Sequence, residues 1–366
     1  MFETKELEIN MGPQHPSTHG VLRVILKLDG ESVVGCDCDI GYLHRGVEKL
    51  AEQREYFQAL TLTDRMDYVA AVYNNLGYIE TVEKLLGVKA PPRAQWIRTM
   101  LAEFSRISSH LLWLGTHALD IGAMSVFLYC FREREQILDL FEAYCGARLT
   151  LNAVRIGGQL SDFPEGWVDE CRRFLSEFPS KIHEYETLLN SNRIWLERTR
   201  GIGVISAEEA IDWALSGPVL RGSGVNWDLR KSNPYAAYAD MEFDVPVGHA
   251  GDSYDRYLCR MEEMRQSRRI ILQALDTMPG GDVRAKVPKR LKPPVGAEVY
   301  HTTEGPRGEQ GVYLKSDGSE TAYRCRFRSP CFVNLQALPV LSQGHLIADV
   351  VTIIGSLDIV LGCVDR

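Results

Sequence analysis

Two histidines stand four residues apart in the segment Gly12-Pro13-Gln14-His15-Pro16-Ser17-Thr18-His19-Gly20. On one helix face this spacing could bind zinc, but Pro16 and the flanking glycines disfavour a helix, and no acidic third ligand is near in sequence. A second interpretation is a turn whose histidines are capped or solvated. A third is a stiff loop that holds one imidazole in a cavity, where it could donate a proton near neutral pH.

Asp120 is a carboxylate at a position where the helix dipole disfavours one. The apolar segment 117–124 closes a long helical pattern, and negative charge at a helix C-terminus is unfavourable. Solvation of the helix end explains the residue without a function. A functional carboxylate is the other interpretation, and both stay open at this point.

Two segments that contain arginine, 65–68 and 324–328, can also be interpreted in more than one way. Arg65-Met66-Asp67-Tyr68 is expected at a helix start, where capping and the dipole explain Asp67, and core packing explains Tyr68. The arginines of Arg324-Cys325-Arg326-Phe327-Arg328 alternate with a period of two, so their guanidiniums should share one face of a strand. That face is either a solvated edge or a surface that holds an anionic cofactor or partner.

The nine cysteines form no recognisable metal or redox motif. No pair has the C-x-x-C spacing of zinc, iron–sulfur or thioredoxin sites. An odd number of thiols without a recognisable targeting sequence fits a reducing compartment. Most of them are therefore expected to be small buried hydrophobic residues.

Composition narrows the classes of function. The 366 residues include 41 Lys+Arg and 49 Asp+Glu, a net charge of -8, which argues against nucleic-acid binding. The most apolar run, 346–364, is long enough to span a bilayer but carries Asp349 and Asp358. Each would cost roughly 2.5–3.5 kcal/mol at mid-membrane, so we expect a buried core helix followed by an extended tail.

A helical bundle is expected to position these residues. Apolar residues recur at steps of three or four from Met66 to Leu86, and Gly87 should end that helix. Alternating apolar residues around Asp29-Gly30 predict a hairpin. Further long helices are expected near 92–118, 127–144, 165–189 and 254–278, a final helix near 345–354, and short strands near 312–314 and 323–327.

The predicted fold class is α+β, mainly α: a central bundle of long helices with a small β portion formed from N- and C-terminal segments. We expect an N-terminal β portion over 1–42, a helical body with embedded loops over 43–280, and C-terminal β segments, helix and tail over 281–366. Because both chain ends should contribute to the β portion, the three segments are expected to form one interlocked unit.

Several segments together resemble the D subunit family of NADH–quinone oxidoreductase, respiratory complex I. The resemblance includes GPQHPSTHGVLR, TDRMDY and the ending GSLDIVLGCVDR. It spans nearly the whole chain, through the stretches 12–23, 41–49, 63–68, 131–142, 154–158, 200–205, 223–235, 252–264, 330–338 and 355–366.

That family is similar in turn to the large subunit of nickel–iron hydrogenases, whose fold is therefore expected here. Asp67 and Ala70 stand where an R-x-C-G-x-C box would have cysteines, and 358–363 replaces a D-P-C-x-x-C box, with Val360 at one cysteine position and only Cys363 kept. A centre that needs four thiolates cannot form from one, so no nickel or iron is expected to be bound by this chain. The resemblance implies that the vacated cavity takes a quinone head group.

The resemblance also implies a role for each site residue. His19 and Tyr68 would hydrogen-bond the two quinone carbonyls, and Asp120 would pair with His19 and respond to its loss of a proton. Both donors suit a two-electron, two-proton reduction. Asp358 and Val360 would also line the cavity. Arg45 and Arg65 would face the terminal 4Fe-4S cluster, which a partner subunit carries. In many members a histidine stands where this chain has Thr150, so redox-linked protonation near the cluster is not expected here.

The implied enzyme is a proton-translocating NADH:quinone oxidoreductase, such as one that uses ubiquinone, with NADH and the cluster bound by partner subunits. Other peripheral-arm subunits and a membrane-arm subunit at the quinone entrance are further expected partners. The expected location is peripheral, on the cytoplasmic face of a bacterial inner membrane. Two alternatives remain: the equivalent subunit of a ferredoxin- or deazaflavin-dependent membrane oxidoreductase, and a non-catalytic scaffold.

Overall fold

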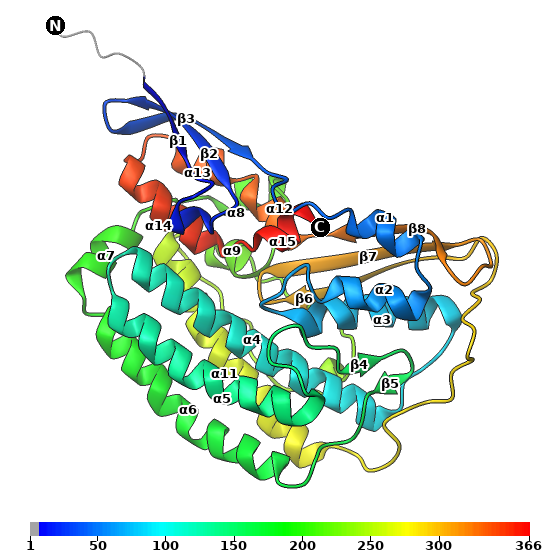
Figure 1. The fold of residues 1–366 in the computed structure, drawn as a ribbon. Coiled ribbons are helices and arrows are strands. Elements are labelled where there is room, and N and C mark those ends of the chain that lie inside the picture. The colour runs from blue at the N-terminus through cyan, green and yellow to red at the C-terminus, as the bar shows by residue number, and fades with distance from the viewer. Residues whose placement is uncertain (1–6) are drawn as a thin grey trace, which may run out of the picture.

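The structure, a computed structural model, describes residues 7–366, so the first six residues of the expected 1–42 segment lie outside it. A bundle of long helices forms the body of the molecule (Figure 1). Helix α4 contacts both α5 and α11, and α6 packs on α5 and α11. The four helices are α4 (Pro92–Asp120), α5 (Met124–Cys145), α6 (Trp167–Leu189) and α11 (Ser253–Thr277).

Helix α4 lies at the centre of the bundle because its apolar residues cover more than one face. Met100, Leu101 and Ala102 are all fully buried, although as successive residues they point in different directions around the helix axis. Phe104 meets Trp167 of α6 edge to face, with ring centroids 6.1 Å apart. Pro92 begins α4, a position where proline has no hydrogen bond to lose.

The strands of the described segment, 7–366, form two three-stranded antiparallel sheets and one short hairpin. The first sheet has the order β1-β2-β3 and lies at one end of the molecule, beyond the helix bundle, and the second has the order β6-β7-β8 (Figure 1). The strands are β1 (Leu7–Met11), β2 (Arg23–Asp29), β3 (Ser32–Asp39), β4 (Val154–Arg155), β5 (Gly158–Gln159), β6 (Glu298–Gly305), β7 (Gly308–Ser316) and β8 (Ala322–Arg328).

Shorter helices connect the sheets to the bundle. They are α1 (Val47–Glu52), α2 (Tyr56–Thr63), α3 (Ala71–Leu86), α7 (Arg193–Thr199), α8 (Ala207–Asp212), α9 (Gly217–Gly222), α10 (Leu229–Ser232), α12 (Pro330–Leu335), α13 (Leu338–Ser342), α14 (Ile347–Leu357) and α15 (Leu361–Asp365). Helix α13 packs on β3, α1 packs on β8, and α14 contacts α4. These contacts support our proposal that the three sequence segments form one interlocked unit.

The fold class is as expected, but several local predictions need correction. The strands from the two ends of the chain belong to separate sheets, and β6 was not predicted. Helix α3 begins at Ala71 rather than near Met66, because 64–70 forms a turn held by contacts described below. The segment after α14 is the short helix α15 and not an extended tail.

The apolar run 346–364 is divided between two short buried helices, α14 and α15. Across residues 7–366, the structure contains no helix with both the length and the apolar character needed to cross a bilayer.

Candidate functional site

The loop 12–20 gives its two histidines different surroundings. A single 3₁₀ turn over Pro16–Thr18 begins at His15, whose Nδ1 accepts the amide proton of Ser17 at 3.3 Å. The loop is closed tightly: a Cβ on Gly12, which has φ +88°, would lie 2.1 Å from the main-chain oxygen of Leu22. His15 therefore helps to hold the loop together.

His19 follows this turn in the left-handed region, at φ 55°. Its ring makes no side-chain hydrogen bond within residues 7–366, and it is open to solvent although protein surrounds much of it. A non-glycine residue in this region stores backbone strain, which is often found at functional sites. His19 is thus the histidine of the loop that is available to a ligand.

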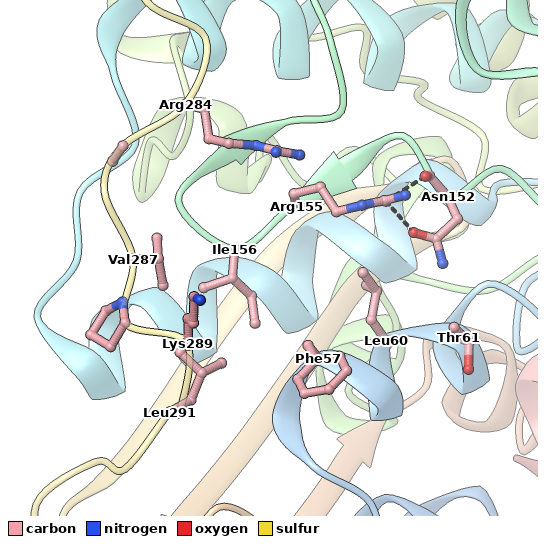
Figure 2. A pocket seen from close by; sticks show the side chains of 12 residues that line it. Phe57, Leu60, Thr61, Asn152, Arg155, Ile156, Arg284, Val287, Lys289 and Leu291 are labelled. Carbon is pink, nitrogen blue, oxygen red and sulfur yellow. Dashed lines mark hydrogen bonds between the residues drawn. The ribbon is translucent and has the colours of Figure 1, made fainter.

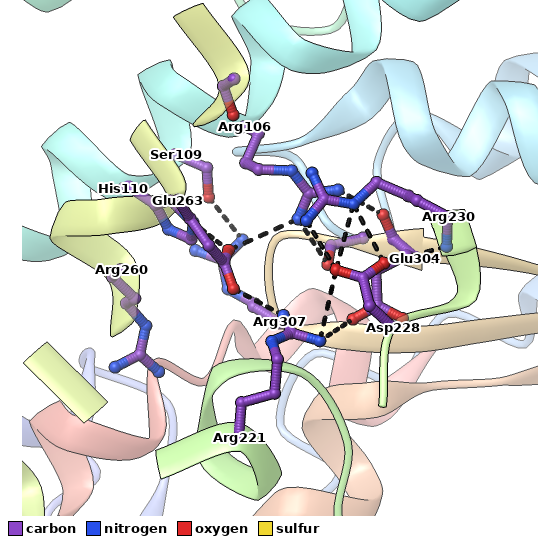
Figure 3. Close-up of polar contacts among 12 residues, drawn as sticks. Arg106, Ser109, His110, Arg221, Asp228, Arg230, Arg260, Glu263, Glu304 and Arg307 are labelled. Carbon is purple, nitrogen blue, oxygen red and sulfur yellow. Dashed lines mark hydrogen bonds and ion pairs between the residues drawn. The ribbon is translucent and has the colours of Figure 1, made fainter. Parts of the chain in front are cut away.

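Arg307, which the sequence analysis did not single out, lies at the centre of the site. It extends from the turn between β6 and β7, and its side chain is 2% exposed. Its Nη1 donates to Ser109 Oγ at 2.9 Å (Figure 3). The same nitrogen donates to Asp67 Oδ2 at 2.9 Å. Its Nη2 donates to Asp358 Oδ1 at 3.0 Å, and Nε donates to the Asp358 main-chain oxygen at 2.9 Å.

The bond from Arg307 explains why Asp67 does not cap a helix. The Asp67 carboxylate is buried and ion-paired in the turn 64–70, and its main-chain oxygen accepts from Asn74 Nδ2 at 3.0 Å. The expectation that Asp67 caps α3 is therefore wrong. Tyr68, next in the chain, is half-buried and packs on the core formed by the C-terminal segment, where a Cβ on Gly362 would lie 3.2 Å from its ring.

Asp358 and Val360 follow α14 in the same region. Asp358 ends this helix at φ 53°. Its Oδ2 has no hydrogen-bond partner among the residues from Leu7 onward, and Arg260 Nε lies 3.8 Å away. Burial raises the pKa of the Asp358 carboxyl. Val360 is buried, and its amide donates to Cys331 Sγ at 3.4 Å.

Both expected proton donors carry no net charge at neutral pH. Burial, together with the positive charge of Arg307, lowers the pKa of His19 to about 4. Burial raises the pKa of the Tyr68 phenol, while Arg307 acts in the opposite direction. One guanidinium therefore acts electrostatically on both residues, although they come from separate segments of the chain.

Asp120 does not pair with His19 in this structure, contrary to expectation. It is the last residue of α4 and is half-buried. Burial raises the pKa of its carboxyl, while the nearby His15 and Ser17 side chains act against this shift. No His19–Asp120 ion pair is formed in the part of the chain that the structure describes. The carboxylate thus faces the residues that hold the loop rather than the free ring.

Arg45 and Arg65 lie side by side on the surface. Arg45 Nη2 donates to the main-chain oxygen of Arg65 at 3.1 Å, and Arg65 Nη1 pairs with Asp64 at 2.9 Å. The alternating arginines of β8 behave differently. Arg324 pairs with Glu52 at 2.7 Å and Arg328 with Glu309 at 3.3 Å, whereas Arg326 is exposed.

A buried charge network continues from the site into the bundle (Figure 3). Glu263 Oε2 lies 2.8 Å from His110 Nε2, and Glu263 Oε1 accepts from Arg221 Nη2 at 2.6 Å. Glu304 accepts from Arg221 Nη1 at 2.8 Å. These side chains are fully buried, so their mutual pairing is what makes their burial tolerable.

The hydrogenase-like positions contain an ion pair where thiolates would stand. Asp67 binds Arg307, and Cys363 Sγ lies 2.9 Å from Ser329 Oγ. Burial raises the pKa of the neighbouring Cys331 thiol, which is one of the cysteines expected to be buried. No group of three or more His, Cys, Asp or Glu residues is arranged to hold a metal ion among residues 7–366.

Comparison with known proteins decides the family. The family described as "Respiratory-chain NADH dehydrogenase, 49 Kd subunit" matches residues 120–297 and 287–366. A protein of Solibacter usitatus, named as a second D-type subunit of NADH-quinone oxidoreductase, is 59% identical over 365 residues, covering 100% of this chain and 98% of the relative. The chain belongs to this 49 kDa subunit family.

Other members of the 49 kDa subunit family are similarly close. D-type subunits of NADH-quinone oxidoreductase from Geotalea uraniireducens and Desulforamulus reducens are each 53% identical to this chain, and each match covers 100% of it. The matches cover 100% of the Geotalea protein and 99% of the Desulforamulus protein. In this member of the 49 kDa family, the resembling segments 63–68 and 355–366 meet at Arg307, and 12–23 lies within reach of its charge. The only sequence signal for Arg307 was a cation in the hairpin turn Gly-Pro-Arg-Gly at 305–308.

Proposed function

We propose that this chain is the quinone-site subunit of a proton-translocating NADH:quinone oxidoreductase. It binds the quinone head group and assists its reduction by an iron–sulfur cluster in a partner subunit. NADH as the electron source is taken from the names of the relatives, which favours it over ferredoxin or a deazaflavin. Proton pumping belongs to membrane partners in this proposal.

One observation carries the proposal: two neutral hydrogen-bond donors from distant segments share the field of a single buried cation. His19 and Tyr68 are both partly accessible, and both respond to Arg307. A fixed positive charge stabilises negative charge that develops on a bound carbonyl oxygen, at no cost of reorganisation. A non-catalytic scaffold would not need this arrangement.

The donors have distinct roles in the two-electron, two-proton reduction. The Tyr68 hydroxyl donates to one carbonyl oxygen and passes its proton as charge develops there. Because its pKa is about 4, His19 acts as a neutral imidazole. It can donate from one ring nitrogen to the second carbonyl oxygen while the other ring nitrogen accepts a proton from solvent, to which the ring is open, so no free imidazolium is required. Asp358 and Val360 border the head group.

Arg45 and Arg65 face the partner that carries the terminal 4Fe-4S cluster. Their exposed, adjacent guanidiniums would favour the more negative, reduced form of a nearby cluster. Thr150 leaves this side without a titrating histidine, and a lower-potential quinone fits that difference. The complex would place the chain peripherally at the cytoplasmic face of a bacterial inner membrane, with a membrane-arm subunit at the quinone entrance.

The test is quinone reductase activity of the purified complex with Tyr68→Phe or His19→Ala. Loss of a positioned proton donor should lower kcat about 10²–10⁴-fold while the complex still assembles. His15→Asn is the matched control, because Asn keeps an acceptor for the Ser17 amide. Full activity in an assembled Tyr68→Phe complex would refute the site assignment.

A further inference from the structure

A cavity away from the site has a cationic wall above an apolar floor (Figure 2). It encloses about 470 Å³ between α2, the β4–β5 hairpin and the loop 279–296. Its apolar lining includes Phe57, Ile156 and Leu291, and its charged lining consists of Arg155, Arg284 and Lys289. No Asp or Glu lines it in the described part of the chain.

The cations of this cavity have no carboxylate partner within residues 7–366. Arg155 Nη1 donates to neutral oxygens, among them the main-chain oxygen of Val154 at 3.0 Å, and Arg284 Nε donates to the Gln159 main-chain oxygen at 3.3 Å. Burial and the like charge of Arg284 lower the pKa of Arg155. In a chain with a net charge of -8, this is a local excess of positive charge that nothing in the described chain balances.

The main chains that carry the two arginines are fixed together by hydrogen bonds. The Ala285 amide donates to the Gly157 oxygen at 2.7 Å, and the Gln159 amide donates to the Val283 oxygen at 2.9 Å. A Cβ on Gly158, which has φ +153°, would lie 2.1 Å from that Val283 oxygen, so only glycine allows this approach.

A buried ion pair holds the hairpin from behind. Arg98 donates to Glu83 at 2.6 Å and to the Arg155 main-chain oxygen at 3.0 Å, and Glu83 accepts from the Gly157 amide at 2.7 Å. The main chain that carries Arg155 is therefore preorganised, which lowers the entropic cost of binding a complementary group at this residue.

The cavity also adjoins one of the arginines assigned to the cluster-bearing partner. Thr61 lines the cavity, and its main-chain oxygen accepts from Arg65 Nη1 at 2.9 Å. A partner that reaches Arg65 would thus meet the edge of the cavity.

We propose that this cavity is a docking site for a segment of the cluster-bearing partner subunit that carries a carboxylate flanked by apolar side chains. The identity of the partner rests on the proposed function, whereas the chemistry of the segment rests on the cavity alone. The carboxylate forms charge-assisted hydrogen bonds with Arg155 and Arg284, and its apolar neighbours cover Phe57 and Leu291. Binding thereby neutralises the like charges that the isolated chain leaves facing each other.

The direct test is photo-cross-linking in the purified complex with p-benzoylphenylalanine at position 57. Position 295 is the control, because Val295 is 81% exposed and lies outside the cavity lining. We expect a cross-link from position 57 to a peptide of the cluster-bearing subunit that contains Asp or Glu beside apolar residues. No cross-link in an assembled complex, a cross-link to lipid, or a peptide without a carboxylate would overturn the proposal.

A charge-reversal pair tests the electrostatics. The complex with Arg284→Glu should lose the partner subunit roughly tenfold more readily than the unaltered complex when the salt concentration is raised. The reason is that the attraction between Arg284 and the partner's carboxylate becomes a repulsion. Lys286→Glu makes the same charge change two residues away, outside the cavity, and should behave as the unaltered complex does. If Arg284→Glu fails to accumulate, Lys289→Glu, at an exposed residue, replaces it. Equal retention in the cavity and control variants would contradict the docking.

This proposal can fail separately from the quinone site. Tyr68→Phe should lower activity without changing retention of the partner, and Arg284→Glu should change retention first. An acidic peptide from a different subunit of the complex would overturn the partner assignment. Full activity in the Tyr68→Phe complex would leave the docking result untouched.

Discussion

Arg307 and Asp358 are joined by two hydrogen bonds, one to the side chain and one to the main chain of the aspartate. Nη2 donates to Oδ1 at 3.0 Å and Nε donates to the main-chain oxygen at 2.9 Å. The guanidinium therefore fixes the backbone at the end of α14 as well as a charge. The remaining nitrogen, Nη1, then holds Asp67 at the opposite side of the site.

Removal of Arg307 should destabilise the chain strongly. Arg307→Met leaves two buried carboxylates facing one another, and loss of one partner of a buried ion pair costs about 3–5 kcal/mol. Urea unfolding of the purified chain measures this loss. Asp67→Asn combined with Arg307→Met should recover part of the stability. Full recovery of activity by that double variant would show that the charge is dispensable.

The pH profile of quinone reduction should contain no step from His19 near pH 6.5. Its pKa of about 4 keeps the ring neutral across pH 5–8. His19→Gln should therefore lower kcat at every pH in this range by a similar factor. Activity of the purified complex between pH 5 and pH 8 provides the measurement. An acid limb near pH 6.5 that disappears in His19→Gln would contradict the assignment of a neutral ring.

Asp120 should couple to His15 rather than to His19. A double-mutant cycle with His15→Ala and Asp120→Ala should give an interaction energy of roughly 0.5–3 kcal/mol, because Asp120 faces His15 and Ser17. The cycle with His19→Ala should be additive in thermal stability. The opposite result would mean that the free ring moves toward Asp120 in solution.

His117 should make the chain sensitive to acid. The ring is fully buried between Trp113 and Trp195 without a hydrogen-bond partner in the described chain, and burial lowers its pKa to about 3. The unfolded state binds a proton near pH 6.5 and the folded state does not. The stability from this group is therefore present above pH 6.5 and is lost as the pH falls toward 3.

His117→Leu should remove that dependence. Between pH 6 and pH 4, the free energy of unfolding falls with falling pH in the unaltered chain. In the variant, the slope of this fall should be smaller by about 1.4 kcal/mol per pH unit. Urea unfolding at several pH values measures the slope. His183→Leu, at an exposed site on α6, is the control and should leave the slope unchanged.

Sequence patterns predicted the long helices well because their apolar repeats are local. Pro92, Gly87 and Gly146 mark helix ends whatever the rest of the chain does. The start of α3 failed for a non-local reason. Asp67 binds Arg307, 240 residues away, and this bond replaces the helix-capping role that its local sequence indicates.

The site was predictable where a residue had an unusual type in a rigid loop, and unpredictable where its partner was remote. His15 and His19 stood out together, but only the geometry shows that one ring serves the loop and the other remains free. Arg307 gave almost no signal, because a cation in a hairpin turn is ordinary. Its importance comes from contacts across three separate segments.

The link between Asp67 and Arg307 has a consequence for synthesis of the protein. At about 5–20 residues per second, Asp67 is added to the growing chain roughly 12–48 s before Arg307. During that interval the turn 64–70 lacks the charge that holds it, although the helical periodicity around it is already complete. The long helices can therefore begin to form on the nascent chain, while the proposed quinone site is completed only after Arg307 and the C-terminal segment have been added.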